Sequence, residues 1–394
     1  MRRSLAAAFL LVACSRIPGP APTATPESPD AGVDAAPPAD AAADAAPVVD
    51  AAAAVDAAAA DAAPVATRRT PTWLKGSTHV HAAPSGDSGT DVPSVIAWYE
   101  AHGYDFIVLT DHNRVTRVDA DVGPSVRFPD KGLVVLAGIE LTYNPGACDP
   151  PPPEVDGKCR IHVNGLGVTT RPEGKIEWAD RKATTRIGMY RAALRWIEAA
   201  GGVVQLNHPQ WHWGTSRELL SILAGEGVHV VEIANVQFSR WNAGDATRPS
   251  TEALWDAVLT AGGTMWGVAS DDAHDYGPSG GKYPAGGGWI MVDAPRDPVA
   301  ILSAIDQGRF YASTGVVLTR AEVFDGALEV DVAGREPHVI RFIGGGRVLS
   351  EVTGTSARFP LAGAPGYVRA VVERRDGTRA WVQPVRTSAH AGGH

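Results

Sequence analysis

The chain has 394 residues and a formal net charge of −9, of which −6 falls on residues 71–394. At roughly 100–200 residues per domain, this length predicts two or three structural units. A mildly acidic body argues against a protein that holds long nucleic acids by charge, because phosphate binding needs Lys and Arg. The sequence has no run of 18 apolar residues, which argues against a membrane-spanning helix.

The N-terminus has the pattern of a bacterial lipoprotein signal over residues 1–14. Arg2 and Arg3 precede a short apolar segment that ends in Leu11-Val12-Ala13-Cys14. A basic start and an apolar stretch are typical of a signal peptide, and the cysteine predicts lipid attachment at Cys14. The alternative is a simple cleaved signal with an incidental cysteine. A lipidated chain would be anchored in the cell envelope, at the outer membrane or a periplasmic face, without spanning a membrane.

Residues 15–70 are predicted to be a disordered linker. Ala occupies 22 of the 46 positions from 21 to 66, and residues 15–70 contain no aromatic residue. Such a segment buries too little apolar surface to offset the entropy lost on ordering. We therefore expect a tether that holds a folded body away from the membrane.

Two cysteines, Cys148 and Cys159, flank a proline-rich loop. In an oxidising compartment outside the cytoplasm we expect them to form a disulfide. The alternative, a cysteine metal site, lacks the usual CxxC pair. A disulfide would hold this loop beside His162, where it would shape the wall of a site.

From Trp73 onward, short apolar runs alternate with helical patterns. The runs predict strands over residues 75–81, 106–110, 133–141, 161–168, 203–207, 229–234 and 264–270. Helices are predicted at 92–102 (capped by Asp91), 187–200, 217–224 and 251–261. This alternation predicts an α/β domain over 71–315, built on a parallel barrel or sheet. A strand at 288–292 and a helix at 298–307 complete it.

Residues 316–388 have a different texture. Short apolar strands are separated by Gly, Pro and Asp turns, and they are predicted at 316–323, 327–332, 339–343, 357–360, 367–373 and 381–384. This pattern predicts a small all-β module of the sandwich type.

Six of the twelve histidines lie at or near the ends of predicted strands, close to other polar residues. With three carboxylates they form a set of nine candidate ligands: His79, His81, Asp87, His112, Glu140, His162, His208, Asp272 and His274. In a parallel barrel the strands end at one rim, so these side chains should meet there. One strand-end histidine alone is more often structural, but nine such groups exceed one tetrahedral zinc and predict two or three ions.

Five of these segments resemble the motifs of the polymerase and histidinol phosphatase (PHP) superfamily: His79-Val80-His81, Leu109-Thr110-Asp111-His112, Gly138-Ile139-Glu140, Asn207-His208-Pro209 and Ser270-Asp271-Asp272-Ala273-His274. Residues 308–315 and 380–384 are similar to its CehA/McbA-type subgroup. The resemblance covers about residues 74–314. It implies a distorted seven-stranded barrel with three metal ions.

The resemblance also implies a ligand set for each ion. The first would be held by His79, His81, Glu140 and Asp272, the second by Glu140, His162 and His208, and the third by Asp87, His112 and His274. Imidazole with carboxylate suits Zn, Mn or Fe. The spacing of the motif favours Asp272 over Asp271 as the ligand.

We expect a metal-dependent hydrolase. The leading hypothesis is a phosphoesterase that acts on phosphomonoesters or phosphodiesters. Clustered divalent ions lower the pKa of a bridging water to about 7, which supplies hydroxide. Glu140 and Asp272 would be essential because they hold the ions. His212 is a candidate proton donor to the leaving group, although a surface role is the alternative.

Four other polar and aromatic residues each allow two interpretations, one functional and one structural. Asp111 and Asp271 either orient ligand imidazoles or cap turns. Trp211 and Trp213 either line the site as a wall for an aromatic leaving group or pack in the core.

Three further functions stay open at this point: a 5′-to-3′ exonuclease on short oligonucleotides, a carbamate or aryl-ester hydrolase, and a tethered protein that binds a ligand through its metals. The expected partner is a small phosphoester or aryl ester. Long nucleic acid is not expected, and the lipid at Cys14 would be the only membrane contact.

Overall fold

The structure, a computed structural model, describes residues 68–387 apart from 117, 119–131, 155–157 and 279. The predicted signal peptide with Cys14, and residues 15–67 of the predicted linker, lie outside the described residues. Among the described residues, no helix combines the length and the apolar character needed to cross a membrane.

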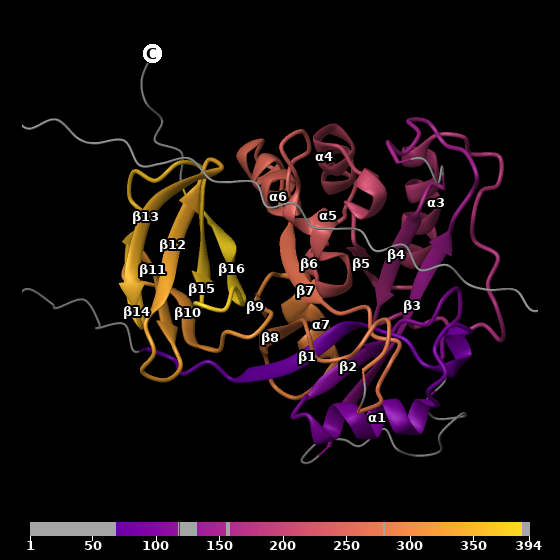
Figure 1. Ribbon diagram of the computed structural model, residues 1–394, viewed down its shortest axis with the longest axis horizontal. Helices are drawn as coiled ribbons and strands as arrows, with labels where there is room; N and C mark the ends of the chain where they lie inside the picture. Colours follow the sequence, from indigo (N-terminus) through magenta and orange to yellow (C-terminus); the bar gives the residue numbers. More distant parts are fainter. Residues whose placement is uncertain (1–67, 117, 119–131, 155–157, 279, 388–394) are drawn as a thin grey trace, which may run out of the picture. The chain divides into compact units, whose positions relative to one another are not determined.

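The described chain is a mixed α/β protein, as predicted (Figure 1). Its strands up to residue 315 are β1 (Trp73–Val80), β2 (Phe106–Leu109), β3 (Val134–Tyr143), β4 (Ile161–Leu166), β5 (Val203–Leu206), β6 (Val230–Asn235), β7 (Trp266–Ser270), β8 (Trp289–Asp293) and β9 (Phe310–Ser313). Its helices are α1 (Val92–Ala101), α3 (Arg186–Ala199), α4 (Arg217–Gly225), α5 (Ser239–Ala243), α6 (Thr251–Thr260) and α7 (Pro298–Asp306). Short 3-10 turns occur at η1 (Ala83–Ser85), η2 (Trp211–Trp213) and η3 (Val236–Phe238).

Several helices begin where a side-chain oxygen satisfies a backbone N–H of the first turn. Asp91 accepts from Ser94 N at 2.8 Å and so caps α1, as the sequence predicted. Thr185, Ser216, Ser250 and Asp297 cap α3, α4, α6 and α7 in the same way.

The seven predicted barrel strands are neighbours in sequence order, β1-β2-β3-β4-β5-β6-β7, within a 13-stranded sheet. The prediction of an all-parallel arrangement is wrong at one strand, because β4 pairs antiparallel with both β3 and β5. The chain returns through residues 144–160, and the antiparallel pairing puts Ile161 at the start of β4 beside Tyr143 at the end of β3. The amino end of β4 therefore lies at the edge where the neighbouring parallel strands have their carboxyl ends.

The sheet does not close into a barrel through a hydrogen-bonded ladder. Its order ends at β7, and β1 pairs instead with β2 and with β8. The two ends of the seven-stranded part meet at one isolated bridge, Val80 with Ala273, and His81 N donates to Ala273 O at 2.9 Å. This single contact brings the segments after β1 and β7 together.

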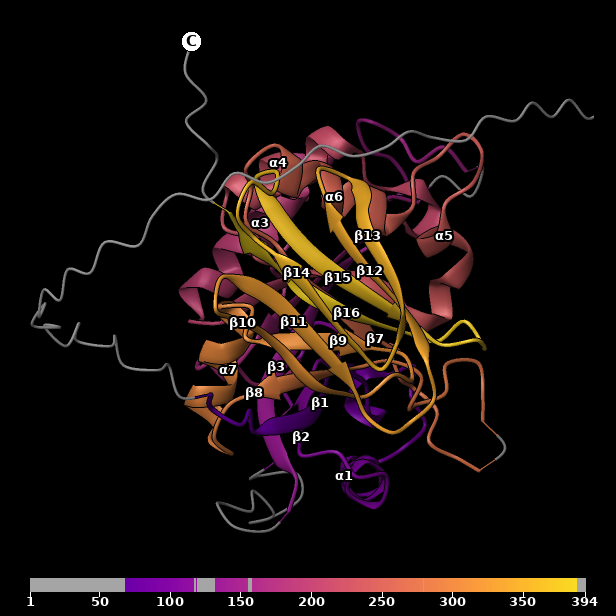
Figure 2. The same cartoon turned by 90° about the vertical axis from the view of Figure 1, so that its left-hand side faces the viewer.

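Residues 318–386 form strands only, within the described residues. They are β10 (Leu318–Phe324), β11 (Ala327–Val332), β12 (His338–Gly344), β13 (Arg347–Gly354), β14 (Ser356–Pro360), β15 (Tyr367–Glu373) and β16 (Arg379–Arg386). β10, β11 and β14 make a separate three-stranded sheet, and the rest continue the large sheet through the pairing of β16 with β9 (Figure 2). Side chains of both sheets, such as Leu328 and Phe342, share one apolar core.

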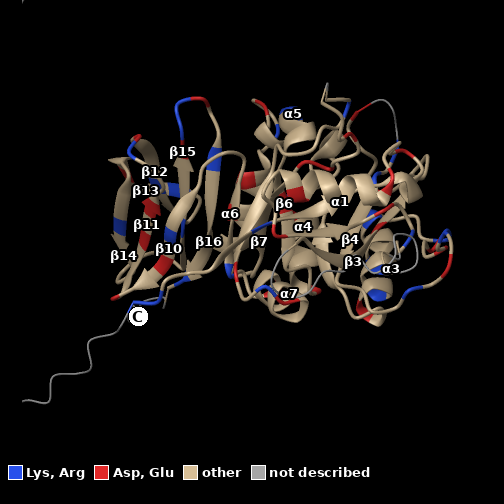
Figure 3. Cartoon of the chain, turned by 90° about the horizontal axis from the view of Figure 1, so that it is seen from below, with Lys and Arg blue, Asp and Glu red and all other residues tan. Residues whose placement is uncertain are grey.

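Ion pairs tie the start of the described chain to the body. Arg68 Nη1 lies 2.9 Å from Glu329 Oε2 in β11, and Arg69 Nη1 lies 3.1 Å from Asp293 Oδ1 in β8. Residues 68 and 69, which the sequence assigned to the linker, thus contact the folded part. Acidic and basic residues are interspersed over the described chain (Figure 3), in keeping with its mild net charge.

A buried ion pair joins α6 to β15. Arg369, 1% exposed, donates from Nε and Nη2 to the two carboxylate oxygens of Asp256, both at 2.7 Å, and Tyr367 Oη donates to Asp256 Oδ1 at 2.7 Å. Such a pair contributes little compared with apolar packing, but removing one partner strands the other charge without compensation.

Asp256→Ala is therefore expected to lower the free energy of unfolding by about 3 kcal/mol, because the buried Arg369 guanidinium loses its two-pronged partner and keeps only Glu252 Oε2 at 3.3 Å. Urea denaturation followed by circular dichroism measures this change. Arg191→Ala, which removes an exposed pair with Glu226, is the control and should cost less than about 1 kcal/mol. Equal losses in the two variants would contradict this account of the interface.

Candidate metal centre

The nine predicted ligands come together at one edge of the sheet. They are supplied by β1 (His79) and the residue after it (His81), the loop after η1 (Asp87), the segment after β2 (His112), β3 (Glu140), β4 (His162), and the segments after β5 (His208) and β7 (Asp272 and His274). Their ligand atoms form three groups, each with all atoms within 4.8 Å of one another: His81, Asp87, His112 and His274; His79, His81 and Asp272; Glu140, His162 and His208.

The antiparallel direction of β4 explains why His162 belongs to this cluster. His162 is near the start of β4 and pairs in register with Thr142, two residues after Glu140. Residues two apart on a strand face the same side, and His162 Nδ1 lies 2.9 Å from Glu140 Oε1. A parallel β4 would have put its amino end at the opposite edge of the sheet.

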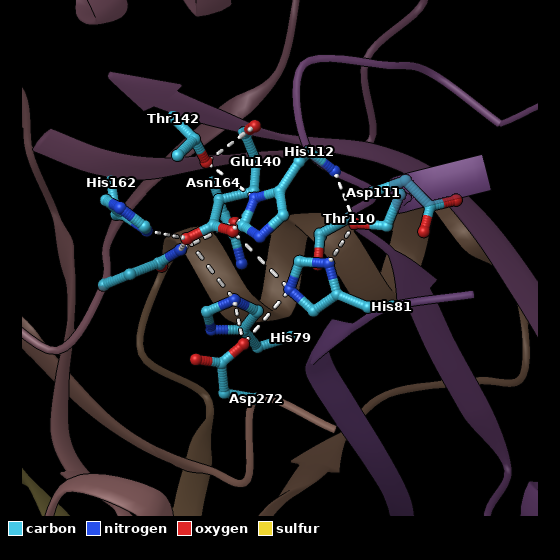
Figure 4. Close-up of polar contacts among 12 residues, drawn as sticks. His79, His81, Thr110, Asp111, His112, Glu140, Thr142, His162, Asn164 and Asp272 are labelled. Atoms are coloured by element: carbon cyan, nitrogen blue, oxygen red, sulfur yellow. Dashed lines mark hydrogen bonds and ion pairs between the residues drawn. The ribbon is translucent and has the colours of Figure 1, made fainter. Parts of the chain in front are cut away.

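The innermost imidazoles and carboxylates point toward one another at ion-pair distances (Figure 4). His79 Nε2 and His81 Nε2 each lie 3.1 Å from Asp272 Oδ1, and Glu140 Oε2 lies 3.5 Å from His81 Nε2. These four atoms are buried and, apart from the 2.7 Å approach of His112 Nδ1 to Glu140 Oε2, lack a hydrogen-bond partner among the described residues. Buried polar atoms that lack partners call for a water or an ion. The two imidazoles and the Asp272 carboxylate, which lie within reach of one point with Glu140 beside them, fit a divalent cation.

The remaining ligands differ in exposure. His208 Nε2 lies 3.7 Å from Glu140 Oε1 and is buried. Asp87 Oδ2 lies 3.0 Å from His112 Nε2 and 3.3 Å from His274 Nε2, but the Asp87 side chain is 49% exposed. The cluster therefore has two buried groups and an outer one that is open to solvent.

Two of the predicted ligands have backbone conformations that are unusual for residues with a Cβ. His208 has φ of 23° and Asp272 has φ of 46°. Such conformations cost free energy and persist where the surroundings hold them, most often at functional sites. Here they turn side chains at the ends of β5 and β7 toward the cluster.

Glu232 contacts two of the predicted ligands, and the sequence analysis missed it. It is fully buried in β6, and its carboxylate lies 2.7 Å from His79 Nδ1 and accepts from His208 N at 2.6 Å. A carboxylate on the far nitrogen of a ligating imidazole fixes the ring and its tautomer. The available signal was a lone acid inside an otherwise apolar strand, Val230–Asn235.

The described hydrogen bonds of Asp111 and Asp271 contradict the prediction that these residues orient ligand imidazoles. Asp111 accepts from Ala82 N at 2.7 Å and from Thr116 Oγ1, and Asp271 accepts from Gly286 N and Gly287 N. Both therefore stabilise turns, because backbone donors at those turns need an acceptor. Burial raises the pKa of Asp271 to about 7. Asp272 instead of Asp271 faces the imidazoles, as the spacing favoured.

The electrostatics of the cluster pair buried carboxylates with imidazoles. Burial opposes the charge of Glu140, yet the imidazoles of His112, His162 and His79 hold its pKa well below the usual range. Burial also disfavours the His112 cation, but Glu140 and Asp87 raise the pKa of His112 to about 10. Burial lowers the pKa of His162 to about 4. Without metal, the carboxylates thus depend on protonated imidazoles for positive charge.

A cavity of about 600 Å³ opens onto the cluster. Its lining includes three of the ligands, Asp87, His112 and His162, with Trp211 on one wall. The imidazole planes of His162 and His208 stand nearly perpendicular to the Trp211 ring, at 5.4 and 5.1 Å between centroids. Trp211 thus lines the site, as one of the two readings of the sequence predicted.

His212 and Trp213 are placed differently. Both interact with Glu154: His212 Nδ1 lies 2.6 Å from its Oε2, and Trp213 Nε1 donates to its Oε1 at 3.0 Å. Neither is among the described residues that line the cavity. Trp213 is buried, in agreement with the alternative prediction that it packs in the core. For His212 the proton-donor role stays a prediction.

Cys148 and Cys159 form the predicted disulfide, with Cα atoms 6.0 Å apart. The residue after Cys159, Arg160, holds its guanidinium 4.1 Å from the centre of the Trp211 ring. The disulfide therefore fixes a segment that packs against the cavity wall next to His162.

Comparison with known proteins adds little. No family model and no curated protein matches the chain. Among solved structures, it is similar to a two-domain protein containing a predicted PHP-like metal-dependent phosphoesterase from Bacteroides vulgatus ATCC 8482. The sequence identity is 17%, the alignment covers 81% of this chain and 100% of the other, and the TM-score is 0.42. Function is therefore inferred from the site itself.

Glu232→Gln should weaken metal binding by about 10- to 100-fold, because an amide holds the His79 imidazole less firmly than a carboxylate. Competition with a chromophoric chelator measures the affinity. Glu198→Gln on the exposed face of α3 is the control and should match the unmodified chain. A Glu232→Gln protein with unchanged affinity would show that this carboxylate does not support the site.

Metal binding should strengthen as pH rises from about 6.5 to about 8.5, because ligating imidazoles must be neutral. The carboxylates Glu140 and Asp87 keep His112 protonated in the metal-free chain, with a pKa of about 10. An arriving ion must displace that proton. Calorimetric titration in buffers of different ionisation enthalpy should detect proton release. Binding with no proton release and no pH dependence would contradict the assignment of His112 as a ligand.

Proposed function

We propose that this protein is a metal-dependent hydrolase of the PHP superfamily that acts on small phosphoesters. The observation that supports it most is the group of three buried atoms on His79, His81 and Asp272 that lie within reach of one ion and lack hydrogen-bond partners, with Glu140 beside them. Burying such groups is costly unless a charge or an ion compensates them. The sequence motifs and the three ligand groups both favour more than one ion.

Divalent ions at these residues would lower the pKa of a bound water toward 7 and offset charge that develops on a phosphoryl oxygen. The chain's own residues do the positioning. Glu140 lies between the groups that contain His79 and His162, so one carboxylate serves two of them. Glu232 holds His79 from the opposite side of its ring.

A phosphoester is favoured over a long polymer by the size and charge of the cavity. About 600 Å³ is within the range of small-molecule sites. Lys175 and Arg181 are among the residues that line it, and Arg181 is paired with Glu177 at 2.7 Å. The Lys175 cation would attract an anionic substrate, whereas the net acidic body disfavours long nucleic acid.

We further propose that the ions are Zn, Mn or Fe, since imidazole and carboxylate ligands suit all three. The proposed location is the cell envelope, with attachment through a lipid on Cys14. The disulfide between Cys148 and Cys159 agrees with an oxidising compartment.

Glu140→Gln should lose both bound metal and phosphoesterase activity, because a neutral amide cannot serve two cationic groups at once. Elemental analysis and turnover of bis-aryl phosphate, 5′-mononucleotides, short oligonucleotides and an aryl carbamate, with and without chelator, measure the two effects. Glu198→Gln serves again as the control with full activity.

Each outcome of these substrate assays distinguishes between the candidate functions. Chelator-sensitive turnover of the phosphoesters supports the proposal. Turnover of the carbamate alone, or of oligonucleotides alone, would replace the substrate class. Metal binding without turnover of any substrate would overturn the enzyme and favour a metal-dependent binding protein.

A further inference from the structure

The outer half of the cavity has an aromatic corner that the proposed hydrolysis does not use. Tyr143, at the end of β3, and Trp178 are both half-buried and both line the cavity. Their ring centroids are 6.4 Å apart and their planes are almost perpendicular, at 86°. Large aromatic surface that stays partly exposed inside a concave site is typical of ligand recognition.

Trp178 is held in place by a residue next to a metal ligand. Asn113 follows His112, and its Oδ1 accepts from Trp178 Nε1 at 2.6 Å and from Thr142 N at 2.9 Å. The Asn113 carbonyl also accepts from Ile176 N at 2.7 Å. Asn113 has φ of 53°, a conformation that costs free energy. The segment 175–178 is thus fixed relative to the metal ligands.

The second aromatic wall of the cavity is already covered. The guanidinium of Arg160 lies over the Trp211 ring, and the imidazole of His162 meets it edge-on. The Tyr143–Trp178 corner is the other aromatic surface that lines the cavity. A perpendicular pair lets a flat ring stack on one partner and meet the other at its edge, the two favoured aromatic geometries.

We propose that the preferred substrates are phosphoesters that carry a flat aromatic group, and that Trp178 is the residue that selects for it. This inference rests on the proposed function, because it assumes that the phosphoryl group lies at the metal ligands Asp87, His112 and His162. The aromatic group then extends along the same cavity toward Trp178. Arg181, with its guanidinium 5.9 Å from the Tyr143 ring centre, borders that corner.

The test compares binding of two non-hydrolysable probes to the full chain loaded with zinc. Phenylphosphonate and methylphosphonate share the anionic group, and only the first has an aromatic ring. We expect phenylphosphonate to bind about tenfold more tightly, from ring burial and stacking. Trp178→Leu should remove this preference with little effect on methylphosphonate. Trp178→Phe, which keeps a flat ring, should retain most of it.

Trp196→Leu is the matched control, since Trp196 is a half-buried tryptophan on α3 that packs against the core outside the cavity. It should leave the preference unchanged. Equal binding of the two probes, binding of neither, or an equal loss for both probes in Trp178→Leu would overturn the inference. Turnover of phenyl phosphate and methyl phosphate is measured in parallel. A preserved binding preference without turnover would refute the hydrolase and leave the aromatic selectivity standing.

Discussion

The buried carboxylates of Glu140 and Asp272 require positive charge beside them, and much of the structure around the site serves that need. A carboxylate out of water is costly unless a cation or several hydrogen bonds compensate it. Here the compensating groups are imidazoles, and the oxygens that face them lack hydrogen-bond partners. Protonated histidines supply the charge in the metal-free chain. Divalent ions would supply it more completely, because they bind the carboxylates and neutral imidazoles together.

The fold supplies this arrangement through strand ends. β1, β3, β5 and β7 bring ligands to one edge, and the reversed β4 adds His162 from its amino end. Glu232 and the strained backbone at His208 then fix the directions of the side chains. The disulfide and Arg160 support the cavity wall at Trp211. Function is thus concentrated in loops and strand ends, on a sheet whose central strands are buried.

The sequence predicted the strand and helix positions well because the apolar runs are long and bounded by capping residues such as Asp91. The convergence of all nine candidate ligands could also be predicted, because histidine and acidic residues at strand ends are easy to recognise in a sequence. The direction of β4 could not be predicted, because the strand is short and buried on both faces, and its residues do not indicate whether its pairing is parallel or antiparallel. Glu232 was missed because its partner, His79, is 153 residues away. The edge strand β13 was missed because its polar and apolar residues do not alternate clearly.

The central claim is that ions bind among residues brought from separate strands. Crystals of the full chain grown with zinc and measured above and below the zinc absorption edge would locate the ions by anomalous scattering. The account predicts peaks within about 2.0–2.2 Å of ligand atoms on Glu140, His208 and Asp272, the usual zinc distances to nitrogen and oxygen. Zinc bound elsewhere, with these three side chains free of metal, would contradict it.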